Sequence, residues 1–461
     1  NAPRVGAVYT GFGVHQTLGL MEMSHLYPPD LVPLIATAWS KTLFFPKEKR
    51  PPLPPDDALN DLLSLAYHTS LLREEGRRLS FRILYFPKGQ TKKDSTERRR
   101  NSRLAEFADE RPLTIAELRR LAPAADSTRT MICVDYNQVT GWNVWALLDT
   151  GQNWWQFTRH EASRGMPPPQ DLCVTSLGPG ELTISSGGMV LLLLRSGATY
   201  LPRGSALDTG PVSNQLESSR RALYRDAVRR LKVKKWDEEG QDNDYPKRFH
   251  DMCLSRILSG IRELGHGGTL LVVPNQLSSS DSRLIDRVSI KHACNYDYLW
   301  ALMVQHLELH KKYYDLRMPF WNRKEPISQG EFRQLSLIEG QREDNEEALS
   351  DCVRFIASLS AVDGALVITD RFRVICFGAE VIAQSPTLRD VHLATNPDAT
   401  ELKSVSIESY GTRHRSAFRF CSSYEDSIAF VVSSDGGVKA TKRIASQVVL
   451  WPEVQATFWG V

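Results

Sequence analysis

With 461 residues, of which 41% are hydrophobic and 24% charged, the chain has the composition of a folded protein, which excludes wholesale disorder. Its length predicts two or three domains with full-sized cores. The formal net charge is only +3, so bulk electrostatics give no reason to expect nucleic acid as a partner.

The seven cysteines are scattered along the chain and never form a CxxC pair. An odd and dispersed set favours reduced intracellular thiols over a disulfide framework or a metal cluster. The longest uninterrupted apolar run, Met189 to Leu194, is far shorter than the roughly 20 residues of a membrane-spanning helix. We therefore expect a cytoplasmic protein with no membrane partner.

Residues 4–240 are predicted to form an N-terminal α+β region. Five prolines between residues 46 and 55 indicate a surface connector. After it, Leu59, Leu62 and Leu63 recur at the spacing of one helical face. From about residue 128 onward the apolar runs become short and are separated by turn residues, which predicts an antiparallel sheet. This change of periodicity leaves open a split into two subdomains near residue 125.

Two features of this region could contact ligands. Trp142, Trp145, Trp154 and Trp155 cluster in the predicted sheet and could stack on a nucleobase, although packing in the core is the interpretation we favour. A strongly basic helix over residues 215–235 could contact nucleic acid or anionic lipid. The acidic residues that follow it favour a solvated connector instead, with a domain boundary in this polar run.

A second domain is predicted over residues 245–450, with residues 451–461 as a tail. A helix leads into the buried strand 269–273, which is a compact apolar run. A later helix over residues 347–359 ends just before Asp363. We expect this domain to have an α/β architecture because helices and apolar strands alternate along it.

Residues from about 295 to 345 are expected to be an insertion into this domain. A helix over residues 296–314 carries the pattern H-x-E-x-H, formed by His306, Glu308 and His310. Two histidines at this spacing could hold zinc on one helix face. Because no third ligand follows, we favour the polar face of a packed helix. The rest of the insertion is charged and contains two prolines.

The last hundred residues place four loops at the ends of predicted strands. Short apolar, β-prone runs with helices between them predict a sheet here. Sites in such sheets are built by the loops at the strand ends. These loops contain Asp363-Gly364, Gly378-Ala379, Thr412 to Arg415, and Ser433 to Gly437.

Three basic side chains, Arg413, His414 and Arg415, follow directly on a Gly-Thr pair. We expect Thr412 to be the N-cap of a helix, which places the basic triplet in its first turn. A helix N-terminus carries partial positive charge, so cations are disfavoured there unless an anion lies among them. The pattern therefore predicts a phosphate site, beside which the carboxylate of Asp363 could hold a divalent metal.

Two short motifs resemble those of a known family. Asp363-Gly364-Ala365 and Gly411-Thr412-Arg413-His414-Arg415 are similar to the DGA and GTRHR motifs of diadenylate cyclases (the DAC family), which make cyclic di-AMP from ATP. The resemblance implies a cyclase domain over residues 245–450 with a mixed sheet flanked by helices. The N-terminal half resembles the sensor-type region attached to some members.

In that family two cyclase domains face one another, each holds one ATP with Mg²⁺ or Mn²⁺, and each ribose 3′-hydroxyl attacks the α-phosphorus of the other nucleotide. The resemblance therefore implies ATP as substrate and a homo-oligomer as the active form. It implies catalytic roles for Asp363, His414 and Asp435, and metal binding by Asp363 and Asp435. The implied nucleotide-binding residues are Gly364, Ala365, Phe377, Gly378, Ala379, Gly411, Thr412, Arg413, His414, Arg415 and Ser433.

The chain departs from the family pattern at two loops. Ser433-Ser434-Asp435 stands where the family commonly has Ser-Glu-Glu, and Phe377-Gly378-Ala379-Glu380 stands in place of the usual Tyr-Leu-Pro. One acid is thus missing, another is shorter, and the selectivity for adenine is left open. A nucleotide-binding sensor with weak or no turnover is therefore the alternative to an active cyclase.

Overall fold

The chain divides into two compact units, which consist mainly of Glu22–Arg203 and of Gly204–Val454. The boundary lies at residue 204 and not near residue 240, because the basic helix α6 (Gly210–Leu231) packs on helices of the second unit. Both units mix helices and sheets, which confirms the expected fold class. The computed structural model describes residues 25–41, 51–88, 103–125, 129–149, 169–187, 189–195, 197–200, 205–233, 245–317, 319, 328–433 and 437–454.

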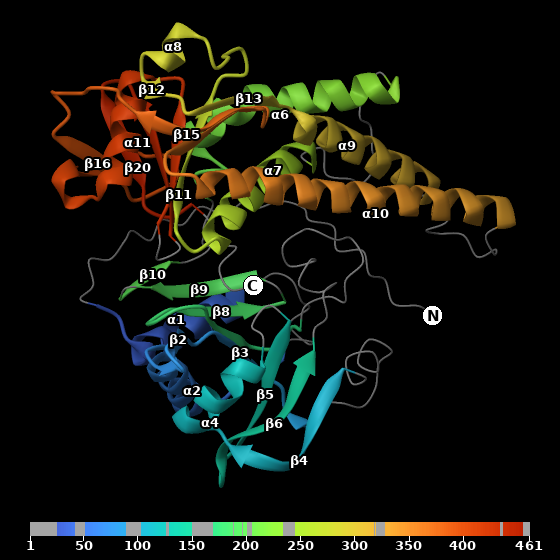
Figure 1. Cartoon of the computed structure of the whole chain (residues 1–461). Coiled ribbons are helices and arrows are strands. Elements are labelled where there is room, and N and C mark those ends of the chain that lie inside the picture. Colours follow the sequence, from blue (N-terminus) through green and yellow to red (C-terminus); the bar gives the residue numbers. More distant parts are fainter. Residues whose placement is uncertain are drawn as a thin grey trace. The chain divides into compact units, whose positions relative to one another are not determined.

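Among its described residues, the N-terminal unit has an eight-stranded sheet in the order β10-β9-β8-β7-β3-β5-β6-β4 (Figure 1). Neighbouring strands are antiparallel except for β3 and β5, so the predicted antiparallel sheet is confirmed with one parallel pair. The strands are β3 (Phe81–Tyr85), β4 (Leu104–Pro112), β5 (Thr130–Asn137), β6 (Gly141–Asp149), β7 (Cys173–Ser176), β8 (Leu182–Ser186), β9 (Met189–Arg195) and β10 (Ala198–Tyr200), beside a separate short hairpin of β1 (Arg73–Glu74) and β2 (Arg77–Arg78).

Helices cover one face of this sheet. Leu59, Leu62 and Leu63 are buried in a single core cluster with side chains from the strands, as their helical spacing predicts. Asp56 and Asp57 lie in the first turn of the same helix, where carboxylates stabilise the helix dipole. Among the described residues, the helices of the unit are α1 (Pro28–Lys41), α2 (Asp56–Ser70), α4 (Ile115–Leu121) and the short 3-10 helix η3 (Ala122–Ala124).

Trp142 and Trp145 are core residues of this unit, and both are buried. The indole nitrogen of Trp142 donates to the carbonyl oxygen of Ala58 at 2.9 Å, and that of Trp145 donates to the carbonyl that follows β3, also at 2.9 Å. A buried indole whose N–H group is already hydrogen-bonded is not accessible for stacking with a ligand. The core interpretation is therefore confirmed for this pair, whereas Trp154 and Trp155 lie outside the described residues.

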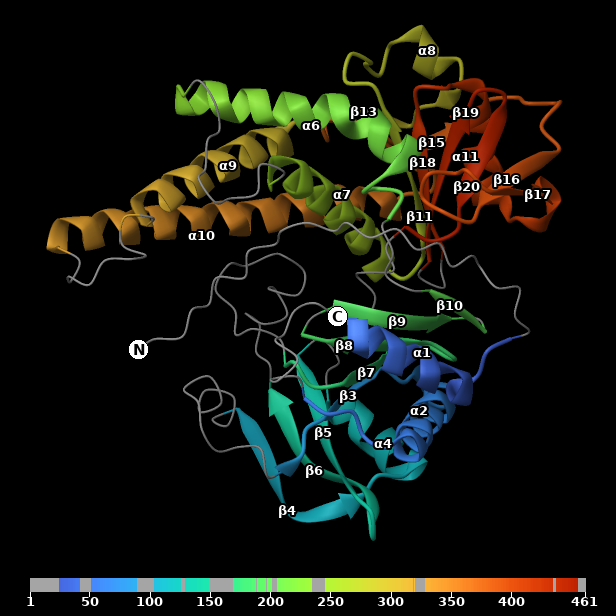
Figure 2. The same cartoon turned by 180° about the vertical axis from the view of Figure 1, so that it is seen from behind.

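The described residues of the second unit form a ten-stranded mixed sheet in the order β12-β15-β14-β11-β18-β19-β20-β16-β17, with β13 also paired to β15 (Figure 2). The β11–β14 and β16–β20 pairs are parallel and the other pairs antiparallel. The strands are β11 (Gly268–Val273), β12 (Val288–Ser289), β13 (His292–Tyr296), β14 (Ala365–Thr369), β15 (Val374–Val381), β16 (Asp390–Ala394), β17 (Leu402–Ser406), β18 (Ile428–Val432), β19 (Val438–Ile444) and β20 (Gln447–Trp451).

The central strands β11, β14 and β18 are buried at every position because both of their faces are covered. Leu270 and Val272 of β11 pack into a cluster with four long helices, whereas Leu271 and Val273 pack with α11 on the other face. The four helices are α6, α7 (Tyr245–Glu263), α9 (Tyr298–Arg317) and α10 (Gln329–Ser358); α11 is Thr412–Ser423, and the short helices are α8 (Ser282–Ile285), η5 (Leu359–Ala361) and η6 (Ile407–Ser409).

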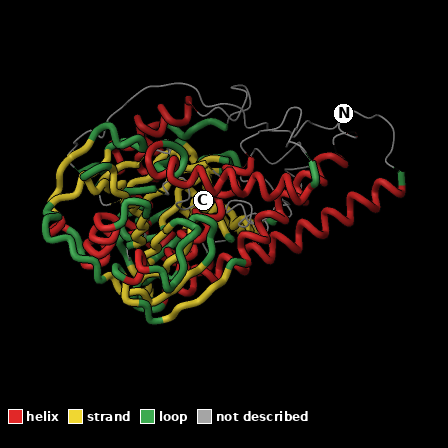
Figure 3. Tube along the Cα trace, turned by 90° about the horizontal axis from the view of Figure 1, so that it is seen from above, coloured by secondary structure: helices red, strands yellow, loops and turns green. Residues whose placement is uncertain are grey.

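Helix α10 begins inside the expected insertion, of which it occupies residues 329–345, and continues into the helix that we predicted over residues 347–359. Ser328 and Glu331 form a capping box, in which the Ser328 hydroxyl accepts the Glu331 N–H at 3.3 Å and the Glu331 carboxylate accepts the Ser328 N–H at 2.8 Å. The buried residues of α10 begin only at Asn345. The apolar side chains of its first turns, such as Phe332 and Leu337, are exposed. These turns extend with other long helices away from the strands (Figure 3).

The histidines of the H-x-E-x-H segment pack against aromatic rings of α7. His306 stacks on Phe249 with 4.1 Å between ring centroids, and its Nε2 is 2.8 Å from the hydroxyl of Tyr245. His310 stacks on Tyr245, also at 4.1 Å. The pair therefore lies on a buried aromatic face and not on the polar face that we expected.

Glu308 of the same segment belongs to a different set of contacts. Its carboxylate forms ion pairs with Arg230 of α6 and with Lys312 of α9. Within the described part of the chain, no group of three or more histidine, cysteine or acidic side chains could hold a metal ion. The contacts of the two histidines and of Glu308 are those of a packing element.

Acidic conditions are expected to destabilise the second unit through His306 and His310. Burial lowers the pKa of His306 well below its ordinary value, and burial with the nearby Arg342 lowers that of His310 to about 3. The folded protein keeps both rings neutral, while the unfolded chain binds protons below about pH 6.5. The free energy of unfolding should then fall by up to about 1.4 kcal/mol per pH unit for each histidine.

Denaturant unfolding between pH 7 and pH 5 measures this effect. The variant His310→Phe keeps a ring that can stack on Tyr245 but cannot titrate, so its stability should fall less steeply with acid than that of the unchanged chain. An equal slope for the two proteins would contradict the assignment of the acid sensitivity to His310.

Candidate functional site

The predicted motif loops meet at one edge of the second unit's sheet. Ala365, the first residue of β14, pairs with Ala379 near the end of β15. On the other side of β11, Gly268 at its start pairs with Val432, the last residue of β18. Because β11 and β14 run parallel, the loops before both strands emerge at the same edge as the loop after β18. The register therefore places Asp363-Gly364, Gly378-Ala379 and the start of the β18–β19 turn at one sheet edge.

The Asp363-Gly364 turn is held against β15 by two glycines. Gly364 has φ +123° and Gly378 has φ +62°, both in the region that favours glycine. A Cβ atom on Gly364 would lie 2.5 Å from the carbonyl carbon of Gly378. No side chain fits between the two backbones, so glycine at residue 364 is a requirement of the local fold.

Asp363 itself is exposed beside this turn. Its backbone carbonyl accepts a hydrogen bond from Nζ of Lys291 at 3.3 Å. Lys291 is also exposed and lies directly before β13. The structure thus adds to the site a cation that we did not single out from the sequence, because nothing in its local pattern relates it to Asp363.

Helix α11 begins at Thr412, so Gly411 is the N-cap and Thr412 is the first helical residue. Our prediction of Thr412 as the cap was therefore wrong by one position. Gly411 still serves well at this position, because glycine is among the better N-cap residues. The basic triplet lies in the first turn as predicted.

Arg413 reaches from α11 to the sheet edge. Its Nη1 donates to the carbonyl oxygen of His266 at 2.9 Å. A Cβ atom on Gly267 would lie 2.9 Å from the same Nη1 and 2.5 Å from the carbonyl oxygen of Val432. The guanidinium therefore lies among the loop before β11 and the end of β18, and the His266 carbonyl is a contact that the sequence did not reveal.

The other members of the triplet have different partners. Arg415 forms an ion pair with Glu408 of η6, with Nη1 and Oε2 3.0 Å apart. The half-buried His414 ring lies 5.6 Å from that of Tyr410 and 6.3 Å from that of Phe418. The triplet is thus divided between the sheet edge and the segment that precedes α11.

The remaining predicted site residues lie in the strands or directly after them. Ala365 and Ala379 are buried, whereas Phe377 and Ser433 are half-buried, and the Ser433 N–H donates to the carbonyl of Gly437 at 2.9 Å. Ser434 and Asp435, which carry the departure from the family pattern, lie outside the described residues. Asp435 therefore stays a prediction.

The local charges suit an anion with a bound divalent cation. An exposed lysine, an arginine and the helix N-terminus that carries this arginine lie at the same sheet edge as Asp363, whose carboxylate is exposed. Mg²⁺ is commonly held by one or two carboxylates together with substrate phosphates, so one exposed aspartate at a phosphate site fits such a metal. Covalent catalysis by the nearby Cys376 is disfavoured, because burial raises the pKa of its thiol to about 12.

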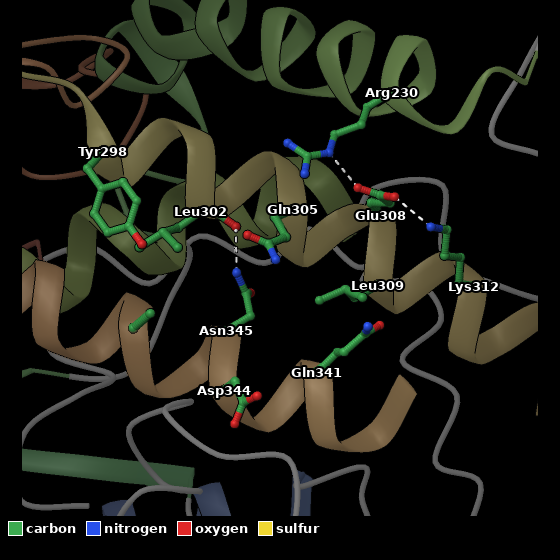
Figure 4. Close-up of a pocket in the computed structure, with 11 residues that line it drawn as sticks. Arg230, Tyr298, Leu302, Gln305, Glu308, Leu309, Lys312, Gln341, Asp344 and Asn345 are labelled. Carbon is green, nitrogen blue, oxygen red and sulfur yellow. Dashed lines mark hydrogen bonds and ion pairs between the residues drawn. The ribbon is translucent and has the colours of Figure 1, made fainter. Parts of the chain in front are cut away.

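A hollow of about 410 Å³ between α9 and α10 contains none of the predicted site residues (Figure 4). In its lining, the carboxylate of Glu308 forms ion pairs with Arg230 and Lys312. The Asn345 amide donates to the carbonyl of Leu302 at 3.3 Å across the hollow's wall. The hollow is therefore separate from the sheet edge that the motifs define, and it is not the candidate site.

Within the described residues, none of the helices combines the length and apolar character needed to cross a membrane.

Comparison with known proteins identifies part of the N-terminal unit. Residues 48–149 match the family model described as the probable sensor domain DACNV, the N-terminal sensor region of DAC-type proteins. Neither the curated proteins nor the solved structures contain a match to the chain. The matched range runs through α2 to the end of β6 and confirms the sensor region that we expected in the N-terminal half.

Proposed function

We propose that the chain is a diadenylate cyclase whose second unit joins two ATP molecules into cyclic di-AMP under the control of the N-terminal sensor. Each ribose 3′-oxygen forms a bond to the α-phosphorus of the other nucleotide and loses its proton. Each α-phosphorus loses pyrophosphate, so two ATP give one cyclic dinucleotide, two pyrophosphates and two protons. The sensor match supports the regulatory part of this proposal.

The observation that carries the proposal is the strand register at the sheet edge. It brings the Asp363-Gly364 turn and the Arg413 side chain to neighbouring strand ends, although the two motifs are separated by almost fifty residues of sequence. Strands β14 and β18 flank β11, so their ends are about 10 Å apart. If the glycine turn and the basic first turn of α11 were unrelated local features, the fold would not have to place them at the same sheet edge.

The residues of this edge can divide the work of phosphoryl transfer. Arg413 and the first turn of α11 would bind the triphosphate, and the carboxylate of Asp363 would hold Mg²⁺ or Mn²⁺ beside the α-phosphate. A bound divalent metal would neutralise developing charge on the phosphate oxygens. Positioning and charge neutralisation supply most of the catalysis in such reactions, so no protein nucleophile is needed.

The proposal requires a second copy of the chain. One site with one ATP cannot close a ring that contains two phosphodiester bonds. Asp363, Gly364, Thr412 and Arg413 are exposed in the isolated chain, which leaves the site open toward a facing copy. We therefore infer a homo-oligomer, at least transient, as the active form.

The test is incubation of the full chain with ATP and Mg²⁺ or Mn²⁺, with the products separated and identified by mass. Cyclic di-AMP and pyrophosphate in a 1:2 ratio are expected, with a rate per chain that increases with protein concentration. Absence of any cyclic dinucleotide at high protein concentration would overturn the proposal. If ATP is nevertheless bound, the second candidate applies, a nucleotide-binding sensor with little turnover, which the Ser433-Ser434-Asp435 departure favours.

The substitution Arg413→Ala should weaken ATP binding by roughly 10- to 100-fold, because a charge-assisted contact to phosphate contributes about 1.5 to 3 kcal/mol. Calorimetric titration with ATP and Mg²⁺ measures the change. Arg419→Ala is the matched control, since Arg419 is an exposed arginine later in the same helix. Equal losses in both variants would show that bulk charge, and not the position of Arg413, is responsible.

A further inference from the structure

The base-binding half of the site has a candidate residue outside the motifs. Strand β13 pairs with β15 so that His292 lies opposite Phe377. Their rings are stacked, with centroids 4.8 Å apart and planes inclined by 20°. His292 is exposed although Phe377 is half-buried behind it. An aromatic ring is thus fixed by a second ring at the border of the site.

The His292 ring lies beside the space that a side chain at residue 378 would use. A Cβ atom on Gly378 would be 3.4 Å from Cδ2 of His292 and 3.5 Å from the carbonyl oxygen of Asp363. The neighbouring Lys291 donates to this same carbonyl oxygen at 3.3 Å. His292 is therefore in one cluster with the turn that carries Asp363. Gly378 is itself buried, and a Cβ atom on it would also lie 3.1 Å from Cγ1 of Val362. The altered Phe377-Gly378-Ala379-Glu380 segment thus has no side chain at residue 378, and the imidazole beside it is supplied by another strand.

We propose that His292 is the stacking residue for the base of a bound purine nucleotide, and this inference rests on the proposed function. Arg413 and α11 provide cations and N–H groups suited to phosphate, whereas the His292–Phe377 pair provides an exposed aromatic surface. Stacking on aromatic side chains is a general means of binding bases and tolerates changes in the base edge. His292 thus contributes base affinity in a segment that lacks the usual family side chains.

The competing explanation is that the His292–Phe377 pair only stabilises the β13–β15 strand pair. Cross-strand aromatic pairs do so in many sheets. A stabilising pair and a base-binding residue differ in one measurable respect. Loss of a base contact weakens binding of ATP but not of inorganic triphosphate, whereas loss of local structure weakens both, because Asp363 lies in the same cluster.

The experiment is calorimetric titration of the full chain with ATP and, separately, with inorganic triphosphate, each with Mg²⁺. His292→Ala is expected to weaken ATP binding by roughly 10-fold or more and to change triphosphate binding less than about 2-fold. His292→Phe should retain most of the ATP affinity because it keeps an aromatic face. His392→Ala, a histidine replacement on β16, is the matched control and should bind both ligands normally.

Unchanged ATP affinity in His292→Ala, or equal weakening of ATP and triphosphate, would overturn the role of His292. Failure of the unchanged chain to bind either ligand would overturn both this role and the proposed function. If the unchanged chain binds ATP, loses it selectively in His292→Ala and yet makes no cyclic product, the base-binding role is supported and only the cyclase activity is overturned.

Discussion

Asp363→Asn is expected to lower the formation of cyclic di-AMP by about 10³-fold or more while leaving the protein folded. The substitution removes one negative charge and keeps the side-chain volume almost unchanged. Among the described residues, the carboxylate of Asp363 has neither a hydrogen-bond nor an ion-pair partner, and the contact of this residue with Lys291 uses the backbone carbonyl. The carboxylate is therefore free to serve a ligand, and its loss should cost less than about 0.5 kcal/mol in the free energy of unfolding.

Two measurements separate catalysis from folding in this variant. Product formation from ATP, quantified by mass spectrometry, should be lost, while thermal unfolding should remain within a few degrees of the unchanged chain. The dependence of ATP affinity on Mg²⁺ gives a third readout and should become weaker. Asp390→Asn, the same change at an exposed aspartate at the start of β16, is the control. Normal turnover by Asp363→Asn would place the metal-binding carboxylate elsewhere.

The fold was predictable from the sequence where burial leaves a periodic pattern. The central strands of the second unit are uninterrupted apolar runs, and the helical face of α2 repeats leucines at the required spacing. The first half of helix α10 was missed because its buried residues begin only at Asn345 and its earlier apolar side chains, such as Phe332 and Leu337, are exposed. Its second half was predicted as the helix over residues 347–359. The boundary between the two units was misplaced for a related reason. The solvent-facing side of α6 is strongly basic, but its buried residues, including Val212, Leu216 and Leu223, pack in the core of the second unit.

The sequence predicted the site residues that belong to short motifs, but not the residues that strand pairing brings next to them. The motifs identify Asp363 and Arg413 because their chemistry is unusual for their positions. Lys291 and His292 gave no such signal, since they lie at the start of an exposed edge strand with unremarkable composition. Their approach to Asp363 and Phe377 depends on the β13–β15 register, which a single sequence does not encode in any readable pattern.

Gly364→Ala is expected to disrupt the site more completely than the loss of any single charged group, because it acts on the backbone that supports the site. A Cβ atom at this position would lie 2.5 Å from the Gly378 carbonyl carbon and 2.8 Å from the Ala379 nitrogen. The value of φ, +123°, is in addition strained for an alanine. The first pair of β14 with β15 must then separate. We expect a loss on the order of 3 kcal/mol in the free energy of unfolding.

Thermal unfolding and ATP titration test this expectation together. The transition of the second unit should fall by roughly 10 °C, and ATP binding should be weakened even at temperatures where the unit remains folded, because the Asp363 turn is displaced from β15. Gly340→Ala is the matched control: nothing lies within 4 Å of its Cβ position in α10, so alanine should raise helix stability by about 0.5 to 1 kcal/mol. An alanine at residue 364 that leaves both stability and ATP affinity unchanged would mean that the two backbones are not in contact, and the argument that joins the Asp363 turn to β15 would fail.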